Sequence, residues 1–150
     1  PKGLVGSEMC IRDSLITEAD TVVIDLGTAT TFDVVSKNKE YLGGSIAPGI
    51  KISLDALTLK TASLKSVELD TPNKVIGKNT YEAIQSGLIM GHASMIDSMV
   101  EKIILEIDIE PKIILTGGLS KVVQPILNVN VEYIENLTLV GLEEIFKLNN

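Results

Sequence analysis

The sequence predicts an α/β fold in which a three-stranded meander is followed by alternating helices and strands. Three observations predict it. Short apolar, β-branched runs at 21–26, 31–36 and 41–46 are separated by short polar or glycine-containing turns. A segment of helical length then begins after Pro48-Gly49. Hydrophobic residues make up 45% of the chain and aromatic residues only 3%, which indicates an aliphatic core such as surrounds strands that are buried on both faces.

Length and composition exclude several classes of protein. A chain of 150 residues predicts one domain. The net charge of −7 argues against a nucleic-acid partner, which requires clustered Lys and Arg. No apolar run reaches the roughly 18–20 residues of a membrane span, so we expect no membrane partner. One Cys and one His argue against both a disulfide framework and a His/Cys metal cluster, and we expect a cytoplasmic protein.

The chain divides into two segments of different character. Residues 1–18 have neither a helical nor a strand period, and we expect them to be poorly ordered or artefactual. The stretch at 7–14 resembles translated sequencing-adapter read-through, while an ordinary flexible N-terminal segment is the alternative. Residues 19–150 are expected to form one lobe.

The first half of this lobe contains the predicted meander and one helix. Strands are expected at 21–26, 31–36 and 41–46, with a polar hairpin turn at 37–40. A helix is expected at about 50–61, and the loop that follows it contains Thr71-Pro72-Asn73.

The second half begins with the longest predicted helix. Asn79 can cap it, Glu82 stands at the capping-box position, and the helix is expected to end near residue 106. An apolar stripe along it comprises Ile84, Leu88, Met95, Met99 and Ile103. A short strand at 112–115, a short helix, a strand near 131–134 and a final helix at about 140–147 complete the prediction.

The segment from Asp25 to Thr31, Asp-Leu-Gly-Thr-Ala-Thr-Thr, is the leading candidate for a site. A carboxylate at the end of a buried strand can hold a cation. The glycine allows a backbone to approach a ligand closely, and the following amides and hydroxyls can donate to phosphate oxygens. A plain β-hairpin turn would give the same pattern.

Three further junctions resemble this one in character. They are Gly43-Gly44 before a helix, Gly77-Lys78-Asn79-Thr80 at the start of the long helix, and Gly117-Gly118 between a strand and a helix. Free backbone amides at such junctions can meet anions. Each alone fits an ordinary turn or cap, but the four in this order are far more specific.

In this order the chain resembles the C-terminal lobe of the type III pantothenate kinases, from about residue 20 to 146. The resemblance implies the actin-like ATPase (ribonuclease H-like) fold and ATP-dependent phosphorylation of pantothenate to 4'-phosphopantothenate, the first step of coenzyme A biosynthesis. The segments that carry it are DLGTATTFDVV, YLGGSIAPGI, VIGKNTYEAIQSGLIMG, LTGGL and LTLVGL.

The resemblance also implies roles for individual residues. Asp25 resembles the ligand of a monovalent cation, K⁺ or NH₄⁺, and Gly27 and Thr28 resemble residues at the ATP. Gly117 and Gly118 resemble the turn near the nucleotide, and Thr80 resembles a residue that contacts pantothenate. Mg²⁺ and a homodimer are implied as well.

The chain departs from the family in ways that bear on activity. The family's N-terminal phosphate loop is not found, and its general base lies in a Gly-x-Asp-Arg segment upstream that nothing here matches. Asp13 beside Arg12 has the wrong order and spacing, so no catalytic base is assigned. We therefore expect this chain to be an inactive fragment of an enzyme.

Some alternatives remain open. A catalytically silent regulatory protein of the Bvg-accessory type would share the fold, and another kinase or phosphatase of the actin-like superfamily is a third reading. Asp33 is expected to face solvent, and His92 to be a packing or surface residue of the long helix. The apolar stripe of that helix could face the core or a second subunit.

Overall fold

The computed structural model describes residues 19–59 and 67–137. Its strands form one mixed sheet in the order β3-β2-β1-β4-β5. The strands are β1 (Thr21–Leu26), β2 (Ala29–Val35), β3 (Tyr41–Pro48), β4 (Lys112–Thr116) and β5 (Glu132–Tyr133). The first three form an antiparallel meander, whereas β4 runs parallel to β1 and β5 parallel to β4.

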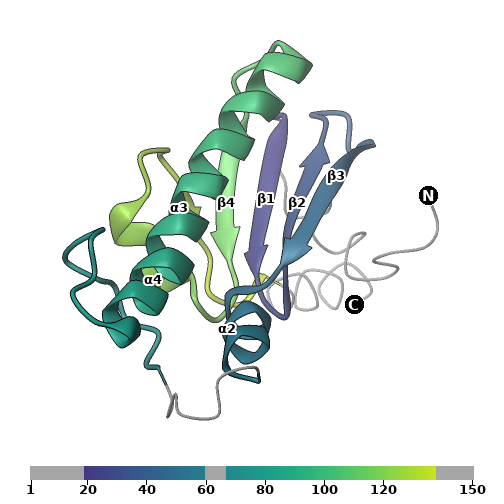
Figure 1. The fold of residues 1–150 in the computed structure, drawn as a ribbon. Helices are drawn as coiled ribbons and strands as arrows, with labels where there is room; N and C mark the ends of the chain where they lie inside the picture. Colours follow the sequence, from purple (N-terminus) through teal and green to yellow (C-terminus); the bar gives the residue numbers. More distant parts are fainter. Residues whose placement is uncertain (1–18, 60–66, 138–150) are drawn as a thin grey trace.

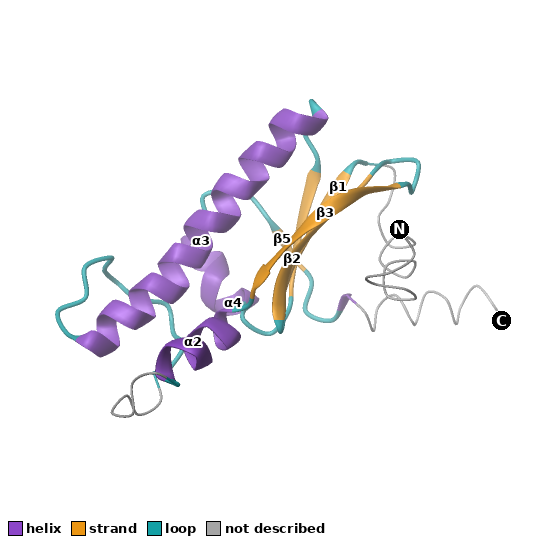
Figure 2. Cartoon of the chain, turned by 45° about the vertical axis from the view of Figure 1, so that its right-hand side comes forward, coloured by secondary structure: helices purple, strands orange, loops and turns teal. Residues whose placement is uncertain are grey.

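The helices gather on one face of this sheet (Figures 1 and 2). The longest, α3, runs diagonally along the sheet, and α2 lies near the end of α3 where that helix begins (Figure 1). They are α2 (Ile50–Thr58), α3 (Thr80–Ile107) and α4 (Ser120–Val123), followed by the 3₁₀ helix η1 (Gln124–Ile126).

Strand β1 is the centre of the core because it pairs on both sides and is covered on both faces. Its alternate residues Val22, Ile24 and Leu26 belong to the cluster that packs against α3. Val23 faces the other way and packs with Val35, Ile114 and Leu137. A strand that is buried on both faces must be apolar almost throughout, as β1 is.

The predicted cap of α3 is present. The Asn79 side-chain oxygen accepts a hydrogen bond from the backbone N–H of Glu82 at 2.9 Å. The Glu82 carboxylate accepts one from the backbone N–H of Lys78 at 2.8 Å, one residue before the position that a standard capping box would use.

The buried line of α3 differs from the stripe that the sequence predicted. Ile89, Ala93, Ile96 and Val100 are its most buried apolar residues. Of the predicted stripe, Leu88 is buried, while Ile84, Met95, Met99 and Ile103 are partly buried against the same core cluster. The predicted stripe therefore borders the core-facing line instead of forming it.

The predicted fold class is confirmed. The three-stranded meander followed by helices and parallel strands is present, as expected for an actin-like ATPase (ribonuclease H-like) lobe. Small differences concern boundaries: β2 begins at Ala29 and not at residue 31, and α2 ends at Thr58. The expectations for residues 1–18 and for a helix at 140–147 lie outside the described residues.

Candidate functional site

Two glycine-containing turns meet at one edge of the sheet. Asp25, near the end of β1, pairs in register with Thr116 at the end of β4, and the two strands are parallel. The Gly27-Thr28 turn follows β1 and the Gly117-Gly118 turn follows β4. The carboxyl ends of parallel strands are the usual place for ligands in α/β sheets.

Close backbone contacts fix these turns relative to one another. Gly117 has a φ of +102°, and a Cβ placed there would lie 2.6 Å from backbone atoms of Leu26. A Cβ on Gly49, at the junction of β3 and α2, would lie 2.2 Å from the carbonyl oxygen of Thr28. Only glycine tolerates such approaches, so the turn after β1, the turn after β4 and the junction between β3 and α2 are held together here.

A cleft of about 390 Å³ opens at this edge. Such a volume lies within the usual range for small-molecule sites, about 300–1,000 Å³. Its lining residues are Asp25, Thr116, Gly117, Gly118, Lys121, Tyr133, Glu135, Asn136 and Leu137. The cleft therefore contains three of the residues predicted for cofactor or cation binding, while Gly27 and Thr28 are exposed in the adjoining turn.

One wall of the cleft includes an ion pair that the sequence did not point to. Lys121 of α4 contacts the Glu135 carboxylate at 2.8 Å, and its ammonium nitrogen lies 5.9 Å from the centre of the Tyr133 ring. Glu135 raises the pKa of Lys121, and Lys121 lowers the pKa of Glu135. Both side chains are exposed, so the pair adds little to folding stability.

The oxygen atoms that line this cleft suit hard cations. The Asp25 carboxylate and the Thr116 hydroxyl offer oxygen ligands, which monovalent cations and Mg²⁺ accept. Mg²⁺ usually takes one or two carboxylates together with substrate phosphates, so a large cluster of acids is not needed. Within the described ranges, no group of three or more His, Cys, Asp or Glu side chains could hold a metal by itself.

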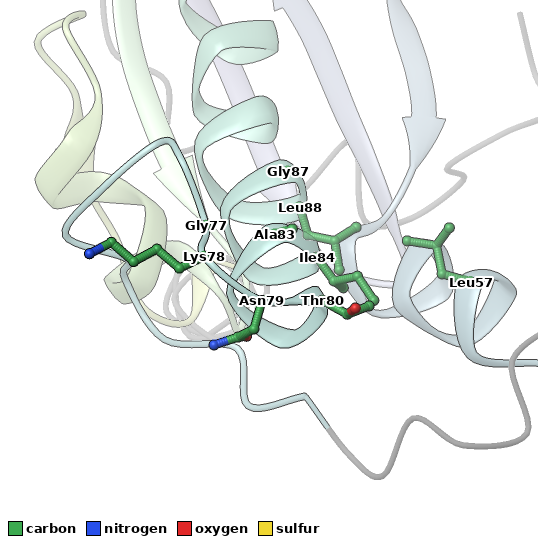
Figure 3. Close-up of a pocket in the computed structure, with 9 residues that line it drawn as sticks. All are labelled: Leu57, Gly77, Lys78, Asn79, Thr80, Ala83, Ile84, Gly87 and Leu88. Carbon is green, nitrogen blue, oxygen red and sulfur yellow. The ribbon is translucent and has the colours of Figure 1, made fainter.

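Thr80 lies at a second hollow. This hollow is separate from the end of the sheet that carries the Gly27-Thr28 and Gly117-Gly118 turns, which we call the glycine edge. This hollow has a volume of about 650 Å³ and lies between α2 and the first turns of α3. Leu57 of α2 points toward Ile84 and Leu88 of α3, whereas Lys78 extends away from α2 (Figure 3). The structure thus places the predicted residue for pantothenate in a separate hollow from Asp25, Gly117 and Gly118.

The expectation that Asp33 faces solvent is wrong. Only 5% of Asp33 is exposed, and its pairing partner on β3 is Gly44. Its carboxylate accepts hydrogen bonds from the Thr31 hydroxyl at 3.3 Å and the Tyr41 hydroxyl at 3.4 Å. Burial and the nearby Asp33 carboxylate raise the pKa of Tyr41.

His92 packs between α3 and the sheet, as expected. Its Nε2 lies 2.7 Å from the hydroxyl of the buried Thr30, two residues after Thr28. Burial lowers the pKa of His92, which favours the neutral imidazole. The contact fixes the start of β2 to the long helix.

Asp97 is a buried carboxylate that sequence reasoning missed. It accepts hydrogen bonds from the backbone N–H groups of Asn128 and Val129 and from the Asn128 side chain, at 2.8–3.1 Å. These bonds hold the segment after η1 against α3. The available signal was weak: an acid at a position that helical spacing places on the apolar face with Ala93 and Val100.

No helix within residues 19–59 and 67–137 has both the length and the apolar character needed to cross a membrane.

Fold and site together define an α/β lobe with a cleft at the carboxyl ends of its parallel strands. Comparisons with known proteins narrow this class. The family model described as type III pantothenate kinase matches residues 8–102. The chain is 45% identical over 128 residues to a type III pantothenate kinase of Anaeromyxobacter sp. (strain K), covering 85% of this chain and 50% of the relative. It is 46% identical to the one from Syntrophus aciditrophicus (strain SB), covering 97% and 59%.

The chain belongs to the type III pantothenate kinase family, which is a family of kinases. It spans about half to three fifths of the length of the curated relatives described above. A solved structure from Campylobacter jejuni, assigned to the Baf family of transcriptional activators, matches with a TM-score of 0.64 and 26% identity. That match covers 99% of this chain and 66% of the other.

Proposed function

We propose that the protein containing this sequence transfers a phosphoryl group from ATP to pantothenate, giving 4'-phosphopantothenate for coenzyme A biosynthesis. The observation that carries the proposal is the meeting of Asp25 with the Gly117-Gly118 turn in one cleft, in a chain of this family. Phosphoryl transfer depends on positioning and charge neutralisation more than on covalent chemistry by the protein.

Each residue of the glycine edge has a proposed task. Thr28 and the amides of the Gly27 turn bind phosphate oxygens, and the Gly117-Gly118 turn lies against the nucleotide. Asp25 holds a monovalent cation, K⁺ or NH₄⁺, and Mg²⁺ accompanies the phosphates. A bound cation offsets negative charge on the phosphates. The oxygen donors at Asp25 and Thr116 support this assignment.

Pantothenate is proposed to contact Thr80 in the hollow beside α2. The hollow combines one hydroxyl at the start of α3 with apolar side chains such as Leu57 and Ile84. A small polar acid with an aliphatic portion requires both kinds of contact. Thr80 is exposed and therefore accessible to a ligand.

Catalysis is proposed to need residues beyond those described here. We assign no general base in this chain and place it in the upstream segment that the family resemblance implies. We also propose that the described residues belong to one lobe of a cytoplasmic homodimer. On this view the 150-residue polypeptide alone does not phosphorylate pantothenate.

The test is a coupled assay of ATP consumption with pantothenate and K⁺. The full-length protein should turn over, with dependence on both pantothenate and a monovalent cation. The 150-residue chain, measured alongside it, should fall more than tenfold below it. Turnover of the short chain within tenfold would refute its inactivity and direct the search for a base to Asp33 and Asp13. Absence of pantothenate-dependent turnover in the full-length protein would refute the kinase proposal.

A second candidate is a regulatory protein that shares the fold without catalysis. The similarity to the Campylobacter jejuni protein favours it, because that protein is assigned to a family of transcriptional activators. The same assay separates the two candidates. A regulator would leave ATP consumption unchanged when pantothenate is added.

A further inference from the structure

The buried Asp97 carboxylate ties the segment after η1 to the second half of α3. Only 8% of Asp97 is exposed. Its Oδ1 accepts hydrogen bonds from the backbone N–H groups of Asn128 and Val129 at 3.0 and 3.1 Å, and its Oδ2 accepts one from the Asn128 side-chain amide at 2.8 Å. In Figure 1 the yellow-green segment between α4 and β5 lies beside α3. These donors replace the water that a buried carboxylate loses.

The hydrogen bonds to Asp97 add something that the apolar packing of the same segment does not supply. Leu127 and Val129 are partly buried against the core cluster. Such contacts are non-directional, so they keep the segment near the helix without fixing its orientation. Hydrogen bonds are directional, and those to a charged acceptor are about twice as strong as neutral ones. Asp97 therefore fixes the direction in which the chain leaves η1.

From this tether the chain leads into one wall of the cleft at the glycine edge. Tyr133, Glu135 and Asn136 line that cleft, and we call these three residues the β5 wall. β5 is an edge strand of two residues, so its pairing with β4 is short. The place of the wall must therefore depend on contacts made by the chain before β5.

The ion pairs beside the β5 wall lie at the surface. Lys112 pairs with Glu132, and Lys121 pairs with Glu135. All four side chains are exposed to solvent, and exposed ion pairs contribute little. Among the residues that the structure describes, Asp97 is thus the buried carboxylate that anchors the stretch leading to the β5 wall.

We propose that Asp97 is a positioning residue for ATP, because it holds the loop after η1 and thereby sets the place of the β5 wall against the nucleotide. The inference rests on the proposed binding of ATP at the glycine edge and extends it to a residue of α3 that does not line the cleft. The hollow at Thr80 should not respond to this tether. At about 1.5 Å per helical residue, Asp97 lies about 25 Å along α3 from Thr80.

The test compares two substitutions of the same chemistry in the full-length protein. Asp97→Asn keeps the shape of the side chain but turns one acceptor into a donor that faces other donors. Asp108→Asn is the matched control, since it removes the same charge from an exposed position at the end of the same helix. Asparagine also tolerates the left-handed φ of 54° found there. Asn128→Ala is a milder variant that removes only the side-chain amide.

Three quantities are measured for each variant. They are the KM values for ATP and for pantothenate, the dissociation constant of ADP with Mg²⁺ by calorimetry, and hydrogen exchange of the backbone amides at 128–136. Asp97→Asn should raise the KM for ATP and the ADP dissociation constant about threefold to tenfold, as expected for the loss of one or two hydrogen bonds. It should also speed exchange at 128–136 and leave the KM for pantothenate unchanged.

The milder variant and the control define the rest of the pattern. Asn128→Ala should shift the two ATP-site values in the same direction by about twofold to threefold. Asp108→Asn should change every value by less than about twofold, as surface substitutions usually do. If Asp97→Asn does not fold, Asn128→Ala measured against Asp108→Asn decides the question.

Failure of this inference differs from failure of the proposed function. If Asp97→Asn speeds exchange at 128–136 but leaves ADP binding and the KM for ATP unchanged, the tether is only structural and the inference is wrong, while the kinase proposal stands. The inference is also wrong if the variant raises both KM values equally. If the wild-type protein binds no ADP and shows no pantothenate-dependent turnover, the proposed function fails and the inference fails with it.

Discussion

The glycine edge and the hollow at the start of α3 are built in different ways. At the edge, the turns after β1 and β4 are held by backbone contacts of Gly117 with Leu26 and of Gly49 with Thr28. At the hollow, the walls are side chains from α2 and α3, and Leu57 is 48% exposed. The hollow has one such backbone contact as well, between Gly77 and the backbone of Glu82 and Ala83, but its wall on the side of α2 consists of side chains.

This difference predicts how the two regions respond to change. A substitution at the edge alters contacts between core strands, so it should affect folding as well as ligand binding. A substitution of an exposed side chain at the hollow, such as that of Thr80, alters a surface, so it should affect one ligand and leave folding intact. The predictions below sharpen this contrast, beginning with the largest expected effect.

Gly117→Ala should destabilise the protein by about 2–4 kcal/mol. The alanine would have to adopt a positive φ, and its methyl group would meet the Leu26 backbone at 2.6 Å. Urea unfolding of the full-length protein measures the effect. Gly118→Ala is the control, because a Cβ at Gly118 meets nothing within 4 Å and should change stability by less than about 1 kcal/mol. Equal losses for the two variants would contradict the packing account of the edge.

His92 should give a smaller effect that depends on pH. Burial lowers its pKa from the ordinary value of 6.5, so the unfolded chain binds a proton more readily than the folded one. The stabilisation is therefore present above pH 6.5 and is lost as the pH falls through the folded pKa. Urea unfolding between pH 7.5 and 5 should show this loss for the wild type and a weaker one for His92→Gln. Identical pH slopes would remove His92 as the cause.

Much of the fold could be predicted because its signals are local. The caps and glycines of the meander and of α3 mark their ends, and the apolar run of β1 marks a central strand. Boundaries moved where pairing decides them: β2 extends back to Ala29 because Ala29 pairs with Pro48. The N-cap of α3 was predicted from two residues alone, Asn79 and the Glu82 three positions after it.

The candidate site was less accessible to sequence reasoning, because it depends on which elements meet. Alternation along β2 places Asp33 on one face but does not say that the face is covered there. The Asp97 carboxylate accepts hydrogen bonds from backbone N–H groups of a loop about 30 residues away, and no local sequence pattern indicates this contact. The separation of Thr80 from Asp25 into two hollows likewise arises only from the packing of α2 and α3 beside the sheet.

The most direct test of the two-region account is a pair of substitutions measured against both substrates. In the full-length protein, Thr28→Ala should raise the KM for ATP about threefold to tenfold and leave that for pantothenate nearly unchanged, since a typical hydrogen bond contributes about 0.5–1.5 kcal/mol. Thr80→Ala should do the reverse. If both variants raise both KM values equally, the edge and the hollow do not serve separate ligands, and the account is wrong.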